Sequence, residues 1–250
     1  MKRVVVILTT VLVFGAAVSY AKDLEFHGTL EFGSFSQYVG GTSGATFFNK
    51  PVFQQSFELN TKPLGLYVKV WNSVSPKGGW NSDFGDEIDY ILGIRRSLGK
   101  GWDIDVGYAF YDLHKVGQIK GDLHAVYGWL GFPKVLDLVR PFLYMEQDIP
   151  TDKNILPGGL CYRLGVYATP EIWKRQPVYL ELSVAGHDDA FGSTSEAISS
   201  TRFTVGIPLG IWKLVFTPKI NFQKRLGRPI DEGGLTKDKI WGGLSLSYSF

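Results

Sequence analysis

Apolar and polar positions alternate along most of this sequence. From Trp102 to Phe110 every even-numbered residue is apolar, while Asp103 and Asp105 stand at odd positions. The same period of two runs through Val178–Val184 and through the last eight residues, which end at Phe250. A period of two places one set of side chains on each face of a β-strand, whereas helical spacing fits none of these windows.

The alternation predicts an all-β fold with one domain, residues 22–250. Pro141 and Pro218 fall inside two of the expected strands, where proline removes a ladder hydrogen bond. The expected strands are antiparallel and number about twelve. They lie near residues 23–35, 51–60, 64–73, 86–97, 102–112, 121–133, 139–146, 158–169, 177–186, 198–208, 212–223 and 239–250.

The expected connections alternate in length. Thr61–Pro63 and Leu98–Gly101 are short, whereas Ser36–Lys50, Ser75–Gly85 and Lys224–Asp238 are longer and rich in Gly, Ser, Asp and Lys. Outer-membrane barrels have short periplasmic turns and longer extracellular loops. The pattern therefore predicts a transmembrane up-and-down β-barrel.

Three features favour a membrane barrel over the alternative, a soluble periplasmic barrel or sandwich. Twelve strands would leave a soluble barrel with a wide interior to fill. The chain ends at Phe250, as substrates of the outer-membrane barrel assembly machinery do, so that machinery and outer-membrane lipid are expected partners. Aromatic residues recur near strand ends on the apolar face, as interfacial girdles require: Trp102, Tyr108, Phe110, Trp129, Phe203 and Tyr248.

The first 21 residues predict a secretory signal peptide. Lys2 and Arg3 precede the apolar run Val4–Val18, and Ser19-Tyr20-Ala21 is a small-x-small cleavage site. Without this segment 24 basic and 24 acidic residues remain, so the formal charge of +2 falls to zero. No basic excess then points to nucleic acid, and the lone Cys161 excludes an internal disulfide.

The first half of the mature chain resembles a known family. Pro51–Leu59 contains a pair of glutamines, Leu66–Asn72 contains Tyr-x-x-x-Trp, and Glu87–Gly93 has an acidic-Ile-acidic start. Together with Trp102–Tyr111, this succession resembles the Gcw_chp family, also called TorF-like porins, although Tyr38-Val-Gly-Gly-Thr lacks the Arg of that family's first loop. The resemblance implies an outer-membrane porin and supplies no catalytic residue or cofactor.

A barrel hydrolase is the competing function, of the lipid A deacylase, phospholipase or protease type. His187-Asp188-Asp189 falls in an expected outside loop, where an Asp/His pair could activate water. A solvated polar loop is the favoured interpretation of these residues. His27 and His124 are expected on the polar face, without a His-x-Ser pattern. No motif for a metal or a cofactor appears.

The polar face carries more charge than a filled interior needs. Its acids come mostly from the first expected strands and its bases from the later ones. Either they pair across the lumen and plug it, or they line a hydrated passage with acids on one wall and bases on the other. Lumen-facing Tyr67, Trp71, Tyr111, Tyr144, Tyr167 and Tyr179 would narrow that passage and could stack on sugar or base rings. We predict a channel for small polar or charged solutes, rather than an enzyme or a structural or adhesive barrel. The expected pore-lining residues are Glu31, Lys69, Asp89, Arg163, Glu181, Arg202 and Lys219.

Overall fold

The computed structural model describes residues 24–40, 46–48, 50–76, 87–113, 122–135, 137–152, 158–172, 176–188, 196–226 and 238–250. The predicted signal peptide and Asp189 lie outside these ranges. Within them, no helix is long and apolar enough to cross a membrane.

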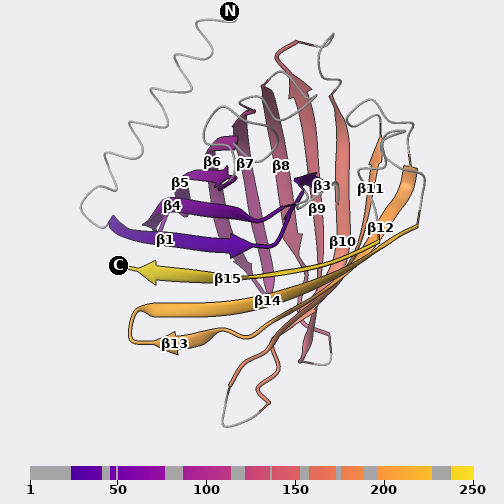
Figure 1. Ribbon diagram of the computed structural model, residues 1–250. Coiled ribbons are helices and arrows are strands. Elements are labelled where there is room, and N and C mark those ends of the chain that lie inside the picture. The colour runs from indigo at the N-terminus through magenta and orange to yellow at the C-terminus, as the bar shows by residue number, and fades with distance from the viewer. Residues whose placement is uncertain are drawn as a thin grey trace, which may run out of the picture.

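Twelve antiparallel strands form a closed barrel (Figure 1). The sheet contains thirteen strands in one hydrogen-bonded order, and a further pairing of β12 with β14 closes the ring and leaves the short β13 outside it. The predicted fold and strand number are confirmed. The barrel strands are β1 (Glu25–Phe35), β4 (Val52–Lys62), β5 (Leu66–Val74), β6 (Glu87–Gly99), β7 (Trp102–Asp112), β8 (Leu123–Gly131), β9 (Val139–Pro150), β10 (Gly159–Ala168), β11 (Tyr179–Asp188), β12 (Glu196–Gly206), β14 (Leu214–Arg225) and β15 (Lys239–Ser249).

The first and last strands meet along one seam. Leu30 pairs with Tyr248 and Phe35 with Gly243, and Gly28 and Phe250 exchange two backbone hydrogen bonds. Both ends of the barrel domain therefore lie on the side of the short turns (Figure 1). A ring closed in this way leaves no barrel strand edge open for pairing with another chain.

The turn side and the loop side differ less than the sequence predicted. At the turn between β6 and β7, Gly99, Lys100 and Gly101 adopt positive φ angles of 81°, 50° and 83°. In the second half of the chain, however, β10 already ends at Ala168, and ten residues separate it from β11 (169–178). Only eight (151–158) separate β9 from β10, because β9 runs to Pro150 instead of the predicted residue 146.

Both prolines inside strands lack an amide donor but still accept a hydrogen bond through their carbonyl groups. Pro141 in β9 accepts a hydrogen bond from the Phe132 amide, and Pro218 in β14 accepts one from the Ile207 amide. Past β12 the chain forms β13 (Leu209–Ile211), which pairs with the start of β14 and extends this hairpin beyond the barrel wall (Figure 1).

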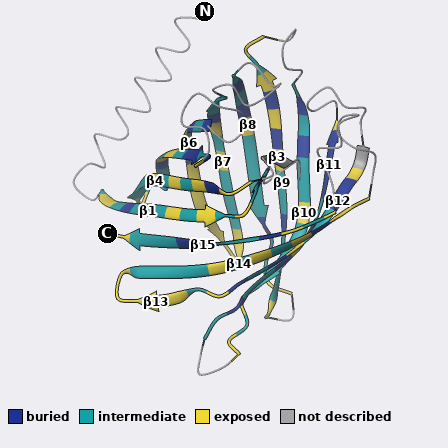
Figure 2. Cartoon of the chain, in the orientation of Figure 1, coloured by how far each residue is buried: buried dark blue, intermediate teal, exposed yellow. Residues whose placement is uncertain are grey.

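The outer face of the wall is apolar and exposed. Exposed positions alternate with covered ones along the strands (Figure 2), and the exposed ones include Leu92, Val106 and Leu164. Aromatic contacts lie at both rims of this face. Tyr90 and Phe110 stack on the loop side (6.4 Å between centroids), and Tyr248 and Phe250 stack on the turn side (6.0 Å). These are the two girdles of a membrane barrel.

Strand β8 faces the other way from the prediction. His124 lies on the outer face, where its Nδ1 is 2.5 Å from the hydroxyl oxygen of Tyr108, and Trp129 lies on the lumen side. The sequence pattern misled because Leu123, Ala125, Tyr127 and Trp129 form the more apolar of the two faces of this strand. Trp129 therefore does not belong to a girdle.

Candidate functional site: the barrel lumen

The seven predicted pore-lining residues all lie on the lumen-facing side of their strands, but in different surroundings. Glu31 stands between Ser56 and Ser247 in the strand register, and Lys219 between Gly206 and Gly243. Asp89 is buried, and Lys69 on the next strand attracts its carboxyl group. The other three, Arg163, Glu181 and Arg202, gather on the wall formed by β10, β11 and β12.

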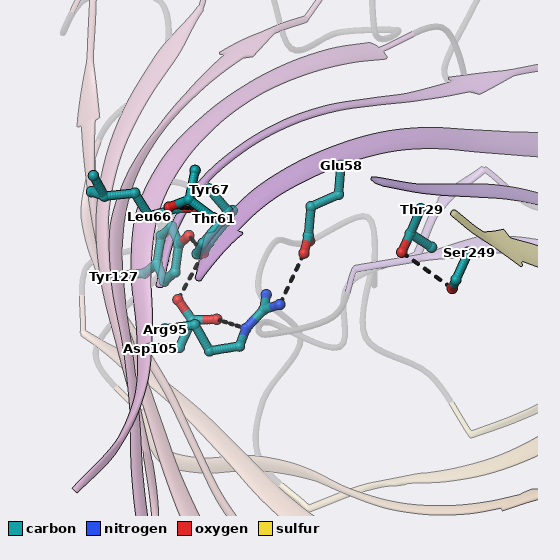
Figure 3. Close-up of polar contacts among 9 residues, drawn as sticks. All are labelled: Thr29, Glu58, Thr61, Leu66, Tyr67, Arg95, Asp105, Tyr127 and Ser249. Atoms are coloured by element: carbon teal, nitrogen blue, oxygen red, sulfur yellow. Dashed lines mark hydrogen bonds and ion pairs between the residues drawn. The ribbon is translucent and has the colours of Figure 1, made fainter. Parts of the chain in front are cut away.

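Arg95 organises the turn-side half of the lumen (Figure 3). Its guanidinium donates to Glu58 Oε1 at 3.0 Å and to Asp105 Oδ2 at 2.9 Å, and it lies 4.6 Å from the centroid of the Tyr67 ring. The Tyr67 hydroxyl donates to Asp105 Oδ1 at 2.7 Å and contacts the hydroxyl of Tyr127. Strands β4 to β8 are thus joined by one network of polar side chains.

The remaining arginine pairs are also local. Arg140 Nη2 lies 2.5 Å from Asp103 Oδ2 and donates to the Gly101 carbonyl, and Arg163 Nη1 lies 3.7 Å from Glu181 Oε1. These pairs join strands one or two places apart, so they run along the wall and do not cross the lumen. The sequence predicted an acidic wall opposite a basic wall. Local pairing corrects that expectation wherever an arginine has an acid within reach.

A second group of charges lies on the loop side. The carboxyl groups of Glu87 and Asp89 on β6 and Glu146 and Asp148 on β9 all interact and are all buried. Tyr111 donates a hydrogen bond to Glu146 at 3.0 Å, and Tyr144 donates to the same carboxyl oxygen. We call these four residues the acidic cluster.

A segment of the chain crosses the lumen beside the acidic cluster. β2 (Tyr38–Val39) pairs with β3 (Thr46–Phe48), a two-stranded sheet separate from the barrel. The Tyr38 hydroxyl donates to Glu87 Oε2 at 2.5 Å, and Arg202 Nη2 donates to the Gly40 carbonyl at 2.9 Å. We call residues 38–40 the strap.

The strap joins opposite walls. Six steps round the ring separate β6, which carries Glu87, from β12, which carries Arg202. Two residues of extended chain span only about 7 Å, so the long side chains of Tyr38 and Arg202 provide the rest of the reach. Tyr38 also packs on Trp71, with 5.7 Å between ring centroids, and Arg202 lies over the Trp241 ring at 5.1 Å.

The turn side of the lumen, beyond the strap, contains a cavity of about 600 Å³. Arg95, Asp105, Trp129, Tyr144 and Arg163 are among the residues that line it. They come from five consecutive strands, β6 to β10, so one continuous part of the wall forms this cavity.

Two histidines considered for hydrolase chemistry, His124 and His187, are placed differently from the prediction, whereas His27 lies on the lumen side as predicted. His187 belongs to β11 rather than to an outside loop; it is buried and stands opposite Cys161 in the register. Asp188 is exposed, and His27 Nε2 lies 3.4 Å from Glu25 on the lumen side near the turn-side end of β1. Among the described residues, no group of three His, Cys, Asp or Glu side chains could hold a metal ion.

Three features of the lumen were not predicted from the sequence. Tyr38 was considered only as part of a loop motif, Asp148 fell beyond the predicted end of its strand, and Phe142 was not assigned to the lumen. The alternation of Tyr144, Glu146 and Asp148 with Met145, Gln147 and Ile149 continues to residue 149, and this signal would have extended the strand. No local pattern indicates that Tyr38 enters the barrel.

Two solved porin structures are similar in architecture to this chain. The KdgM porin matches with a TM-score of 0.56 at 7% sequence identity, over 89% of this chain and 99% of its own. A NanC porin matches with a TM-score of 0.52 at 8% identity, over 88% and 98%. No family model and no curated protein sequence matches the chain, so the resemblance to the Gcw_chp family stays a prediction.

A closed barrel with an exposed apolar exterior is an outer-membrane architecture, so the chain is assigned to the bacterial outer membrane. The structural likeness establishes the architecture alone, and the chemistry of the lumen follows from this chain's own side chains.

Proposed function

We propose that this protein is an outer-membrane channel through which small polar or charged solutes diffuse passively. The observation that carries the proposal is the cavity of about 600 Å³ inside the barrel, lined by arginine, aspartate, tyrosine and tryptophan side chains. Twelve strands lie between eight-stranded barrels, which side chains fill, and the open porins of sixteen strands. A narrow passage is therefore expected. The arginine side chains of this lumen pair along the wall and leave the cavity open beside them.

The strap supplies the constriction of this proposed channel. Strap and acidic cluster together occupy the loop-side half of the lumen, with Arg202 on the opposite wall. Charged side chains at a constriction determine ion selectivity, and low-dielectric walls focus their field. Solutes passing the strap would therefore pass between carboxyl groups on one side and a guanidinium group on the other.

The proposed pore lining keeps the seven predicted residues in four roles. Arg202 positions the strap, and Asp89 belongs to the acidic cluster with Lys69 beside it. Arg163 and Glu181 form an ion pair in the wall, while Glu31 and Lys219 stand between small residues in the register. The charged groups of Glu31 and Lys219 thus face the passage with only small side chains, or none, on the neighbouring strands.

The test is unitary conductance of the mature protein, refolded in detergent and inserted in planar bilayers. Folding is checked first, by a gel in which the unboiled sample migrates differently from the boiled one. Discrete current steps with a stable amplitude would support the channel. Absence of steps from protein that passes the gel check would show that the lumen is plugged, and the channel proposal would fail.

A further inference from the structure

The cavity on the turn side combines aromatic faces with paired charges. Its aromatic lining comes from Tyr127, Trp129 and Tyr144, and its polar lining includes Arg95, Asp105 and Asp103. It is set apart from the strap along the strands: Ser97 in its lining lies near the turn-side end of β6, whereas the strap contacts Glu87 at the loop-side end. The cavity therefore lies on the turn side of the constriction, and Tyr144, which lines the cavity and donates to Glu146, adjoins both.

The aromatic rings form a strip across neighbouring strands. Tyr127 and Tyr144 lie nearly parallel, with 6.1 Å between centroids and an angle of 17°, and Trp129 and Phe142 follow at 6.5 Å and 22°. Phe142 then contacts Tyr167 at 6.2 Å, and Tyr167 stacks on Tyr179 at 6.3 Å. Nearly parallel rings with centroids this far apart are offset. Tyr127, Trp129 and Tyr144 line the cavity, so part of each of these rings is available to another ring-shaped molecule, whereas Phe142 is fully buried.

Several charges around the strip are paired with charges of opposite sign, while Arg96, also in the lining, donates to the Leu64 and Pro63 carbonyls. Arg95 is held by Asp105 and Glu58, and Arg140 by Asp103. Such pairs present guanidinium donors next to carboxylate acceptors, and hydroxyl groups can both donate and accept hydrogen bonds. A lining of paired charges thus favours a neutral ligand with many hydroxyl groups over a ligand with a net charge.

We propose that this cavity is a binding subsite for neutral carbohydrate rings, of one or two sugar units. The apolar face of a pyranose ring would lie on Trp129 and the Tyr127–Tyr144 pair, and its hydroxyl groups would meet the Arg95–Asp105 pair. The volume lies within the range of small-molecule sites, about 300–1,000 Å³. This inference rests on the proposed channel, because the sugar would reach the cavity through the lumen.

The experiment measures block of the single-channel current by added solutes. Maltose and glucose are compared with sorbitol, which carries similar hydroxyl groups on an open chain, and with glucuronate, a ring of similar size with a negative charge. We expect the two neutral sugars to block at concentrations at least about tenfold lower than sorbitol. Equal block by sorbitol would overturn the role of the rings, and stronger block by glucuronate than by glucose would overturn the preference for neutral sugars.

Variants assign the effect to this cavity. Trp129→Ala should weaken block by maltose about tenfold, and Trp129→Phe should restore most of it. Trp102→Ala is the matched control, because Trp102 lies on the next strand and on the outer face. Unchanged block in Trp129→Ala, or the same loss in Trp102→Ala, would refute the site.

A binding assay separates this inference from the proposed function. Equilibrium dialysis of radiolabelled maltose against the detergent-solubilised barrel needs no conduction. Saturable binding that Trp129→Ala abolishes would support the subsite even if the wild-type protein conducts no current. A conducting barrel that neither binds nor is blocked by maltose would leave the channel intact and disprove the subsite.

Discussion

Two adjacent side chains on β6 test the faces of the wall at the scale of single residues. Leu92 is 56% exposed on the outer face, whereas Ile91 points into the lumen, opposite Lys69 and Ala109 in the register. We predict that Leu92→Arg lowers the free energy of unfolding by about 2–4 kcal/mol, the cost of arginine facing lipid near the bilayer midplane. Ile91→Arg, at the same depth, should cost clearly less. Denaturant titration in lipid vesicles measures both, and equal losses would contradict the assignment of faces.

Single residues also show where the sequence was ambiguous. The orientation of β8 was mispredicted because both of its faces read as apolar; Ala125 and Trp129 look like lipid-facing residues, and His124 looks like a lumen residue. In the folded barrel His124 gains a lipid-side partner in Tyr108, and Trp129 gains the lumen cavity. Those partners come from other strands, so no window of β8 alone could reveal them.

At the scale of the strands, the last residue tests the seam between β1 and β15. The Phe250 ring lies over Gly28, where an added Cβ would come within 2.3 Å of the ring. Phe250 and Phe32 are both 51% exposed, so Phe32→Ala is a matched control for Phe250→Ala. We expect Phe250→Ala, but not Phe32→Ala, to lower the amount of folded barrel in cells severalfold, because the terminal Phe is the proposed signal for the assembly machinery.

Refolding without that machinery distinguishes signal from packing. Both variants should refold into vesicles with similar yields, because the backbone hydrogen bonds between Gly28 and Phe250 do not depend on the ring. A yield for Phe250→Ala far below that of Phe32→Ala in vesicles would mean that the ring acts by packing on the seam.

The strap can be tested by removing one hydroxyl group. Tyr38→Phe deletes the hydrogen bond to Glu87, and such a bond contributes about 0.5–1.5 kcal/mol net. The equilibrium between docked and undocked strap should therefore shift by roughly two- to tenfold. We expect a higher mean conductance and more frequent transitions between current levels. Tyr111→Phe is the control, because it removes a hydroxyl that donates to Glu146 of the acidic cluster and leaves the contacts of the strap in place. This variant should leave the conductance unchanged. Equal effects of the two variants would disprove a special role for Tyr38.

The strands were predictable and the strap was not, for a physical reason. In a barrel strand, residues that face lipid alternate with residues that face the lumen. The sequence of Trp102–Phe110 therefore already identifies the two faces of that strand. The strap, in contrast, is held by two distant residues. Glu87 lies 49 positions from Tyr38 and accepts a hydrogen bond from its hydroxyl, and Arg202 lies 162 positions from Gly40, to whose carbonyl it donates. The end of β9 was only partly predictable. Polar and apolar residues alternate to residue 149, which indicates a longer strand, but Pro150 follows directly and suggests that the strand stops earlier.

At the scale of the whole molecule, the distribution of charge depends on register. The sequence showed acids early and bases late, which suggested two opposed walls. In the closed barrel the pairing of β9 with β8 and of β8 with β7 brings Arg140 to Asp103, and the β10–β11 pairing brings Arg163 to Glu181. Part of the predicted field is therefore cancelled locally, and the acidic cluster and bases such as Lys219 contribute to what remains.

Lys219 offers the cleanest test of that remaining field. Its neighbours in the register, Gly206 and Gly243, have no side chains to shield it, whereas Arg202 also holds the strap, so its replacement would change two properties at once. Lys219→Glu changes the lumen charge by two units, and we predict a shift of the reversal potential in a salt gradient towards cation preference. Lys213→Glu makes the same change at the exposed turn before β14, where salt screens charge over about 8–10 Å, and should shift it much less. Equal shifts in both variants would show that selectivity is set at the turn-side mouth, and no shift in Lys219→Glu would remove this residue from the path of the ions.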